Sequence, residues 1–305
     1  METATKKSPL TLILVILTVL ALALCAATVW LAYPYLNPAP VEIQATEPPT
    51  DPPTEPPTEP PTEPPTEPEP TLPPPEANPY GHLDFQYDDR YLACLREETL
   101  AGVDVSAYQK NVDWIQVKAS GIDFAMVRLG YRGYGSGKLV MDEYYYANMN
   151  GAIAAGLDVG VYFFSQAITP EEAKEEAEFV LKAIEGYNLT MPVVYDWEYI
   201  SEEARTAHVD QRTLTDCSRA FLETIEEAGY DTLLYFNVFQ SQYQLFLPEL
   251  KDFDFWLAMY TDRMRYPYKI RMWQYTDSGV VPGIEGYADL NLYFPKHEEP
   301  VTETP

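Results

Sequence analysis

The chain has 305 residues and a formal net charge of −27 at pH 7, because it holds 47 Asp and Glu residues against 20 Lys and Arg residues. This balance excludes an ordinary nucleic-acid-binding protein, since phosphates need basic partners. The charge is also uneven, because residues 42–78 contain acidic residues and no Lys or Arg. We therefore exclude this stretch from the folded part of the chain.

An uncharged apolar segment occupies residues 10–33. It is long enough to cross a bilayer as a helix and predicts a transmembrane signal anchor after a short cytoplasmic N-terminus, residues 1–9. Lys6 and Lys7 precede the segment, and the next Lys or Arg is Arg90. The positive-inside rule then places the rest of the chain outside the cell, at the cell membrane and wall. The alternative is a cleaved signal peptide, which would release a secreted protein.

A proline-rich linker is predicted over residues 34–79. Residues 47–70 repeat the unit PPTE, with one PPTD variant, and this composition favours extended polyproline conformations without a core. About 30 such residues reach roughly 90 Å. We interpret the segment as a semi-rigid extracellular spacer. A single globular domain over residues 80–295 and a disordered tail over residues 296–305 complete the predicted organisation.

The globular region contains eight short β-rich runs separated at first by helical patterns. The runs are GVDVS, FAMVRLG, VGVYFFS, PVVYDWE, TLLYFN, FWLAMY, RMWQYT and ADLNLYF. One helical pattern begins with Thr169 as N-cap, Pro170 at the first helical position and Glu172 completing a capping box, and two others stop at Gly156 and Gly229. Strands that alternate with helices indicate a parallel sheet, and eight of them suggest closure.

The later connections are too short for crossover helices. The fold class predicted is therefore α/β, a modified TIM-like barrel of about five βα units followed by three strands with short connections. We expect this domain to be monomeric.

Acidic residues gather at the predicted strand ends. In PVVYDWE, residues two apart share a face, so Val194, Asp196 and Glu198 point into the barrel at the end where barrel active sites lie. Asp104 on the first strand and Asp289 on the last become neighbours when the barrel closes. Four converging carboxylates raise the pKa of at least one member, which keeps a proton available for general acid catalysis.

Aromatic residues are dense near the same strand ends, which suits a carbohydrate groove because aromatic faces can stack on sugar rings. The candidates for substrate binding are Tyr108, Tyr131, Tyr162, Trp197, Tyr235, Tyr260 and Trp273. No His, Cys and acid cluster has metal-ligand spacing, so we expect no metal or other cofactor. Cys94 and Cys217 could form a disulfide or remain free.

The ordered series GVDVSAYQKNVDW, FAMVRLGYRG, NGAIAAGLDVGVYFF, MPVVYDWE, FWLAMY and WQYTDSGVVPGIEGYADLN resembles the glycoside hydrolase family 25 lysozymes, the N,O-diacetylmuramidases. The resemblance covers nearly all of residues 100–294. It implies hydrolysis of the β-1,4 bond between N-acetylmuramic acid and N-acetylglucosamine in peptidoglycan, with retention. The family's acidic positions map onto the same four carboxylates, with Glu198 matching the general acid/base.

Three questions stay open at this level. The nucleophile could be a second carboxylate or the substrate's own acetamido group, steadied by Asp196. Phe163 stands where many family members have a histidine, so a non-catalytic peptidoglycan-binding protein on the same barrel is the alternative reading. A chitin-like substrate is disfavoured because the longer acidic series DxxDxDxE of chitinases is absent.

Overall fold

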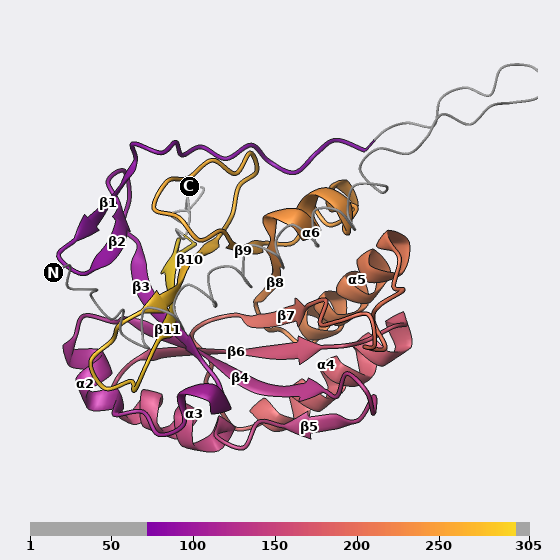
Figure 1. Ribbon diagram of the computed structural model, residues 1–305, viewed down its shortest axis with the longest axis horizontal. Coiled ribbons are helices and arrows are strands. Elements are labelled where there is room, and N and C mark those ends of the chain that lie inside the picture. The colour runs from indigo at the N-terminus through magenta and orange to yellow at the C-terminus, as the bar shows by residue number, and fades with distance from the viewer. Residues whose placement is uncertain (1–71, 297–305) are drawn as a thin grey trace, which may run out of the picture. The chain divides into compact units, whose positions relative to one another are not determined.

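The computed structural model describes residues 72–296 (Figure 1). The predicted anchor and most of the predicted linker lie outside the described residues, as does the tail from residue 297. Within the described part of the chain, no helix combines the length and apolar character needed to cross a membrane.

The centre of the fold is a closed eight-stranded barrel (Figure 1). Its strands follow the order β3-β11-β10-β9-β8-β7-β6-β4, and pairing of β3 with β4 closes the ring. All neighbours are parallel except β11, which runs antiparallel to both β10 and β3. The bounds are β3 Leu100–Val105, β4 Phe124–Arg132, β6 Asp158–Ser165, β7 Val193–Trp197, β8 Thr232–Asn237, β9 Phe255–Ala258, β10 Met272–Gly279 and β11 Ala288–Tyr293. The predicted α/β barrel is confirmed, and each strand falls on one of the eight predicted runs.

Helices follow the first five barrel strands and cover the outside of the barrel. Their bounds are α2 Trp114–Ala119, α3 Tyr145–Ala154, α4 Pro170–Ile184, α5 Gln211–Glu227 and α6 Val238–Tyr243, with short 3-10 turns at Ala107–Gln109 and Leu247–Glu249. Strands β9, β10 and β11 then follow without an intervening α-helix. The barrel therefore has five βα units and three further strands.

The start of α4 follows local sequence rules with one difference. Thr169 caps the helix by accepting a hydrogen bond from the Glu172 amide, at 3.3 Å, and Pro170 occupies the first helical position. The Glu172 carboxylate, however, accepts from the Ile168 amide at 2.9 Å. The predicted capping box is therefore incomplete, because the Glu172 carboxylate binds the amide of the residue before the N-cap and not the amide of the N-cap itself.

An N-terminal hairpin was not predicted. It consists of β1 Phe85–Asp88 and β2 Tyr91–Cys94, and a further short strand, β5 Leu139–Met141, extends the sheet beside β4. The Phe85 ring packs edge-on against Trp273 at 5.2 Å, while Asn78 donates from its amide to the Pro267 carbonyl at 2.9 Å. Ordered contacts to the barrel thus begin before residue 80.

Side-chain alternation divides the apolar residues into two cores. The smaller lies inside the barrel and includes Val194 and Trp256, whereas the larger lies between the strands and the outer layer and includes Tyr195 and Trp197. The period of two along β7 therefore turns Asp196 toward the barrel interior. Both Cys94 and Cys217 are free, which answers the question of their pairing.

Candidate active site

Four acidic side chains meet in one pocket at the mouth of the barrel. Asp104 lies near the end of β3 and is paired in register with Asp289 on β11, while Asp196 lies near the end of β7 and Glu198 follows that strand. Because β11 is antiparallel to β3, its first residues lie at the same mouth as the last residues of the parallel strands. All four carboxylates line a cavity of about 200 Å³.

Asp104 is held by side-chain amides. Its Oδ2 accepts from Gln274 Nε2 at 2.9 Å and from Asn291 Nδ2 at 2.8 Å. Asn291 Oδ1 in turn accepts from Trp256 Nε1 at 2.9 Å, and Gln274 Oε1 accepts from the Tyr235 hydroxyl at 3.0 Å. Burial raises the pKa of Asp104 while these donors oppose the rise, because they stabilise the ionised form.

Asp104 and Asp289 form the first acidic pair, and the proton that this pair retains lies on Asp289. Burial, followed by the negative charge of Asp104, raises the pKa of Asp289 to about 9. Both amide donors reach Oδ2 of Asp104 and stabilise its ionised form. A protonated Asp289 can therefore donate a further hydrogen bond to this carboxylate. One carboxylic acid and one carboxylate therefore form this side of the pocket near neutral pH.

Asp196 and Glu198 form the second acidic pair. Burial raises the pKa of Asp196 well above its usual value, and the charges of Glu198 and Asp104 add to the rise. Burial also raises the pKa of Glu198. Asp196 Oδ1 is buried and has no hydrogen-bond partner among the described residues. This pair thus retains a proton and presents an oxygen without a hydrogen-bond partner in the described part of the chain, and the pKa is raised more strongly on Asp196 than on Glu198.

Backbone hydrogen bonds fix the end of β7. Gln166 Nε2 donates to the Glu198 carbonyl at 2.7 Å, and Gln240 Nε2 donates to the Trp197 carbonyl at 2.7 Å. These bonds come from the segment after β6 and from α6, respectively. The turn that carries Glu198 is therefore held from both sides.

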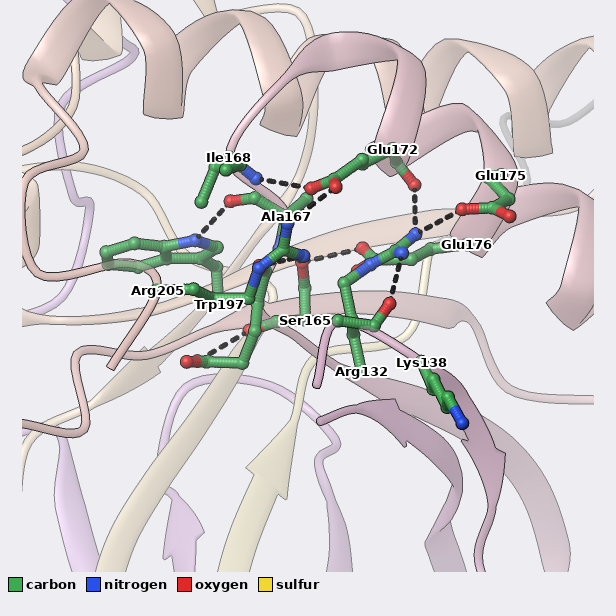
Figure 2. A network of polar contacts seen from close by, with 12 residues as sticks. Arg132, Lys138, Ser165, Ala167, Ile168, Glu172, Glu175, Glu176, Trp197 and Arg205 are labelled. Atoms are coloured by element: carbon green, nitrogen blue, oxygen red, sulfur yellow. Dashed lines mark hydrogen bonds and ion pairs between the residues drawn. The ribbon is translucent and has the colours of Figure 1, made fainter. Parts of the chain in front are cut away.

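A buried ionic network supports this turn from α4 (Figure 2). Arg132 Nε lies 2.7 Å from Glu176 Oε1, and both side chains are almost fully buried. Ser165 Oγ donates to Glu176 Oε2 at 2.6 Å, and the next residue is Gln166, which holds Glu198. Burial raises the pKa of Glu176 to about 7, although Arg132 and Ser165 oppose the rise. Charge pairing between β4 and α4 thus fixes the segment that positions Glu198.

The predicted aromatic residues divide into two groups. Four of the seven line the pocket: Tyr108, Tyr162, Tyr235 and Tyr260. The expected substrate contacts of Trp197 and Trp273 do not hold, because neither residue lines the pocket. Both are buried in the outer core and donate their indole N–H to the carbonyls of Ala167 and Met259, respectively. Tyr131 also lies outside the pocket lining, and its ring stacks with Arg128 at 5.6 Å.

Several pocket residues were not predicted. Arg128 lines the pocket, forms an ion pair with Asp142 at 2.8 Å and lies under the Tyr108 ring at 5.3 Å. Gln274 and Asn291 hold Asp104. Strand alternation carried the signal for these two, since each stands two residues from another inward-facing position in RMWQYT and ADLNLYF.

Phe163 lies on the opposite side of the strand from the pocket. Its side chain is fully buried in the outer core and packs edge-on against Phe179 at 5.9 Å. The difference from the family at this position therefore leaves the lining of the acidic pocket unchanged. The sequence feature that favoured a non-catalytic protein has no counterpart in the pocket.

A closed barrel with carboxylates at the ends of its strands is the architecture of many glycoside hydrolases. The family model described as glycosyl hydrolases family 25 matches residues 103–284. The chain belongs to this family.

Individual relatives agree with this assignment. The autolytic lysozyme of Clostridium acetobutylicum is 28% identical over 196 residues, which are 64% of this chain and 56% of that protein. The modular autolysin LytC of Streptococcus pneumoniae, also solved with a synthetic peptidoglycan ligand, is similar with a TM-score of 0.58 and 27% identity over 65% of this chain and 47% of that chain. The bacterial lysozyme of Streptomyces coelicolor shares the fold, with a TM-score of 0.53 and 21% identity over 64% of this chain and 91% of that chain. The chain thus spans about half the length of the first two relatives.

Proposed function

We propose that this protein is a muramidase that hydrolyses the β-1,4 bond between N-acetylmuramic acid and N-acetylglucosamine in peptidoglycan. The observation that carries the proposal is the meeting of Asp104, Asp196, Glu198 and Asp289 in one pocket. Membership of family 25 and the similarity to an autolysin that has been solved with a peptidoglycan ligand support the substrate class.

Glu198 acts as the general acid and base in this proposal. It protonates the leaving glycosidic oxygen and later takes a proton from the attacking water. Asp196 Oδ1, buried without a partner among the described residues, accepts the N–H of the substrate's 2-acetamido group. That hydrogen bond favours the ionised form of Asp196 and leaves the proton of the pair on Glu198, where the leaving group needs it.

The acetamido oxygen then attacks the anomeric carbon as the glycosidic bond breaks. Water opens the resulting cyclic intermediate from the opposite side, so two inversions give overall retention. Direct attack by a carboxylate also retains configuration and is the competing route. The unsatisfied Asp196 oxygen favours the substrate-assisted route, because a directly attacking carboxylate has no need for an N–H donor. Tyr108, Tyr162, Tyr235 and Tyr260 are proposed sugar contacts.

The cellular arrangement belongs to the same proposal. Residues 10–33 anchor the protein as a single span with residues 1–9 in the cytoplasm. The linker begins at residue 34 and ends before the first barrel contacts, at Glu76 and Asn78, and the catalytic domain that follows acts in the cell wall. If the anchor is correct, the protein should resist alkaline extraction from membranes. Release into the medium as a shortened chain would instead indicate a cleaved signal peptide.

The activity is tested on the purified full-length chain with peptidoglycan as substrate. We expect new reducing ends whose products carry N-acetylmuramic acid at the reducing terminus. Glu198→Gln is expected to reduce the rate by at least about a hundredfold, because it removes the general acid while keeping the shape of the side chain. Wall binding without new reducing ends would favour the non-catalytic alternative.

Substrate assistance has its own test. A strand whose 2-acetamido group is replaced by a hydroxyl should resist cleavage even when it binds, whereas a direct carboxylate nucleophile would still cleave it. Chitin offered beside peptidoglycan checks the preference for the muramic acid polymer.

A further inference from the structure

A second cavity adjoins the acidic pocket on the side of α6. It has a volume of about 500 Å³ and is lined by Glu198, Tyr199, Glu202, Asn237, Phe239, Gln240 and Gln244. Glu198 is the one residue that its lining shares with the acidic pocket. The proposed proton donor therefore stands at the boundary between the two cavities.

Two exposed aromatic side chains stand beside this cavity. Phe239 and Tyr243 lie one helical turn apart on α6 and are 60% and 64% exposed, and their ring centroids are 5.1 Å apart. Tyr199, on the turn after Glu198, is also exposed. Large aromatic rings that face solvent together, beside a cavity with amide side chains, are typical of a binding surface.

The position of α6 is fixed relative to Glu198. Asn237 Oδ1 accepts from the Gln240 amide and Gln240 Oε1 accepts from the Asn237 amide, each at 3.0 Å. The remaining donor of Gln240, Nε2, binds the Trp197 carbonyl directly before Glu198. A ligand that rests on Phe239 and Tyr243 is thus held at a constant distance from the catalytic turn.

We infer that Phe239 and Tyr243, with Tyr199, form an aromatic ledge that binds the sugars of the same glycan strand on the leaving-group side of the cut. This inference rests on the proposed function. The glycan strand is the expected occupant, because it extends past the scissile bond and the second cavity begins at Glu198, the proton donor to that bond.

The test uses the full-length chain and peptide-free glycan strands of defined length. The variant Phe239→Ala/Tyr243→Ala is compared with Gln242→Ala, which changes an exposed residue of α6 outside the cavity lining. On an octasaccharide we expect kcat/KM to fall about tenfold through KM, as the loss of stacking on two rings predicts. The shortest strand that the wild-type protein cleaves should lose much less, and Phe239→Trp should retain activity.

The cleavage position supplies a second readout that a loss of folding would not move. In octasaccharides labelled at the reducing end, loss of the ledge should shift the cuts toward that end, because fewer sugars are then held beyond the leaving group. An unchanged cleavage pattern together with an equal loss on short and long strands would overturn the inference.

Binding to Glu198→Gln separates this inference from the proposed function. Calorimetry with the uncleaved octasaccharide should show about tenfold weaker binding when Phe239 and Tyr243 are also replaced. That comparison holds even if the wild-type protein cleaves nothing, in which case the proposed activity fails while the ledge is still tested. Equal affinities with and without the two rings would reject the ledge, and an effect confined to strands that retain peptide stems would reject sugars as its occupant.

Discussion

Asp289 lies directly opposite Asp104 across the antiparallel pair of β11 and β3, and it is the member of that pair that holds a proton near neutral pH. Asp104 Oδ2 accepts hydrogen bonds from Gln274 and Asn291, which favour the ionised form of Asp104. The two residues differ in burial and hydrogen bonding although they are the same amino acid, and this difference sets a pH dependence for the pocket.

The first prediction concerns the alkaline limb of activity. The folded pKa of Asp289, about 9, lies above its value in the unfolded chain, so the folded state holds the extra proton between roughly pH 4 and 9. Activity should fall as the pH rises through about 9, because ionised Asp289 then repels Asp104. The free energy of unfolding should fall progressively from roughly pH 4 to pH 9, where the folded state binds more protons than the unfolded chain, and should level off above pH 9. Asp289→Asn, which keeps a donor without an acid, should flatten both curves, as measured by kcat/KM and urea unfolding between pH 6 and 10. A steep loss near pH 9 that persists in this variant would assign it to another group.

The second prediction concerns the amide support of Asp104. Asn291→Leu removes the donor to Asp104 and the acceptor of the Trp256 indole, and leaves both partners buried. The free energy of unfolding should fall by about 2–6 kcal/mol, because two buried polar groups each lose a partner at a cost of about 1–3 kcal/mol, although Asp104 keeps its bond from Gln274. Denaturant melts of this variant and of Ser278→Ala, an exposed position on the neighbouring strand β10, provide the comparison. A loss no larger than that of Ser278→Ala would show that these hydrogen bonds contribute little.

The third prediction concerns the network under the Glu198 turn. Arg132→Met leaves Glu176 buried without its cation, which should cost about 3–5 kcal/mol near pH 8. Part of this loss should return at pH 5, because Glu176 already has a raised pKa of about 7 and is protonated more readily without Arg132. The control is Arg212→Met, which breaks exposed ion pairs to Asp216 and Glu249 and should cost at most about 1 kcal/mol at either pH. Unfolding curves at the two pH values would contradict the network's role if both variants behaved alike.

The sequence was sufficient to predict the barrel because period-two patterns, helix caps and glycine stops are local signals. It also brought Asp104 and Asp289 together, since closure of eight strands makes the first and last neighbours. The division of protons between these residues was beyond its reach, because it depends on side chains such as Gln274 and Asn291 that converge from distant segments. The hairpin of β1 and β2 was missed because its four-residue strands gain their apolar contacts from Trp273 and other residues far along the chain.

The last prediction distinguishes Tyr108 from Trp197, two aromatic residues that the sequence alone predicts equally as sugar contacts. Tyr108 is 82% exposed at the pocket rim over Arg128, whereas Trp197 is 2% exposed and packs away from the pocket. Tyr108→Ala should therefore raise KM for glycan strands by about tenfold with a change in unfolding free energy within about 0.5 kcal/mol.

Trp197→Ala should instead destabilise the protein by about 3–5 kcal/mol, because it leaves a large cavity and frees the Ala167 carbonyl. Trp197→Ala should also lower kcat, because it disturbs the turn that carries Glu198, the next residue, and it should leave sugar affinity unchanged. Thermal melts, together with kcat and KM measured separately for each variant, distinguish the two roles. A stable Trp197→Ala protein with a raised KM alone would show that Trp197 contacts sugar after all. The packing of Trp197 in the outer core predicts a destabilised protein instead. Because the indole is held by the buried Ala167 carbonyl, it cannot turn into the groove without separating β7 from the surrounding helices.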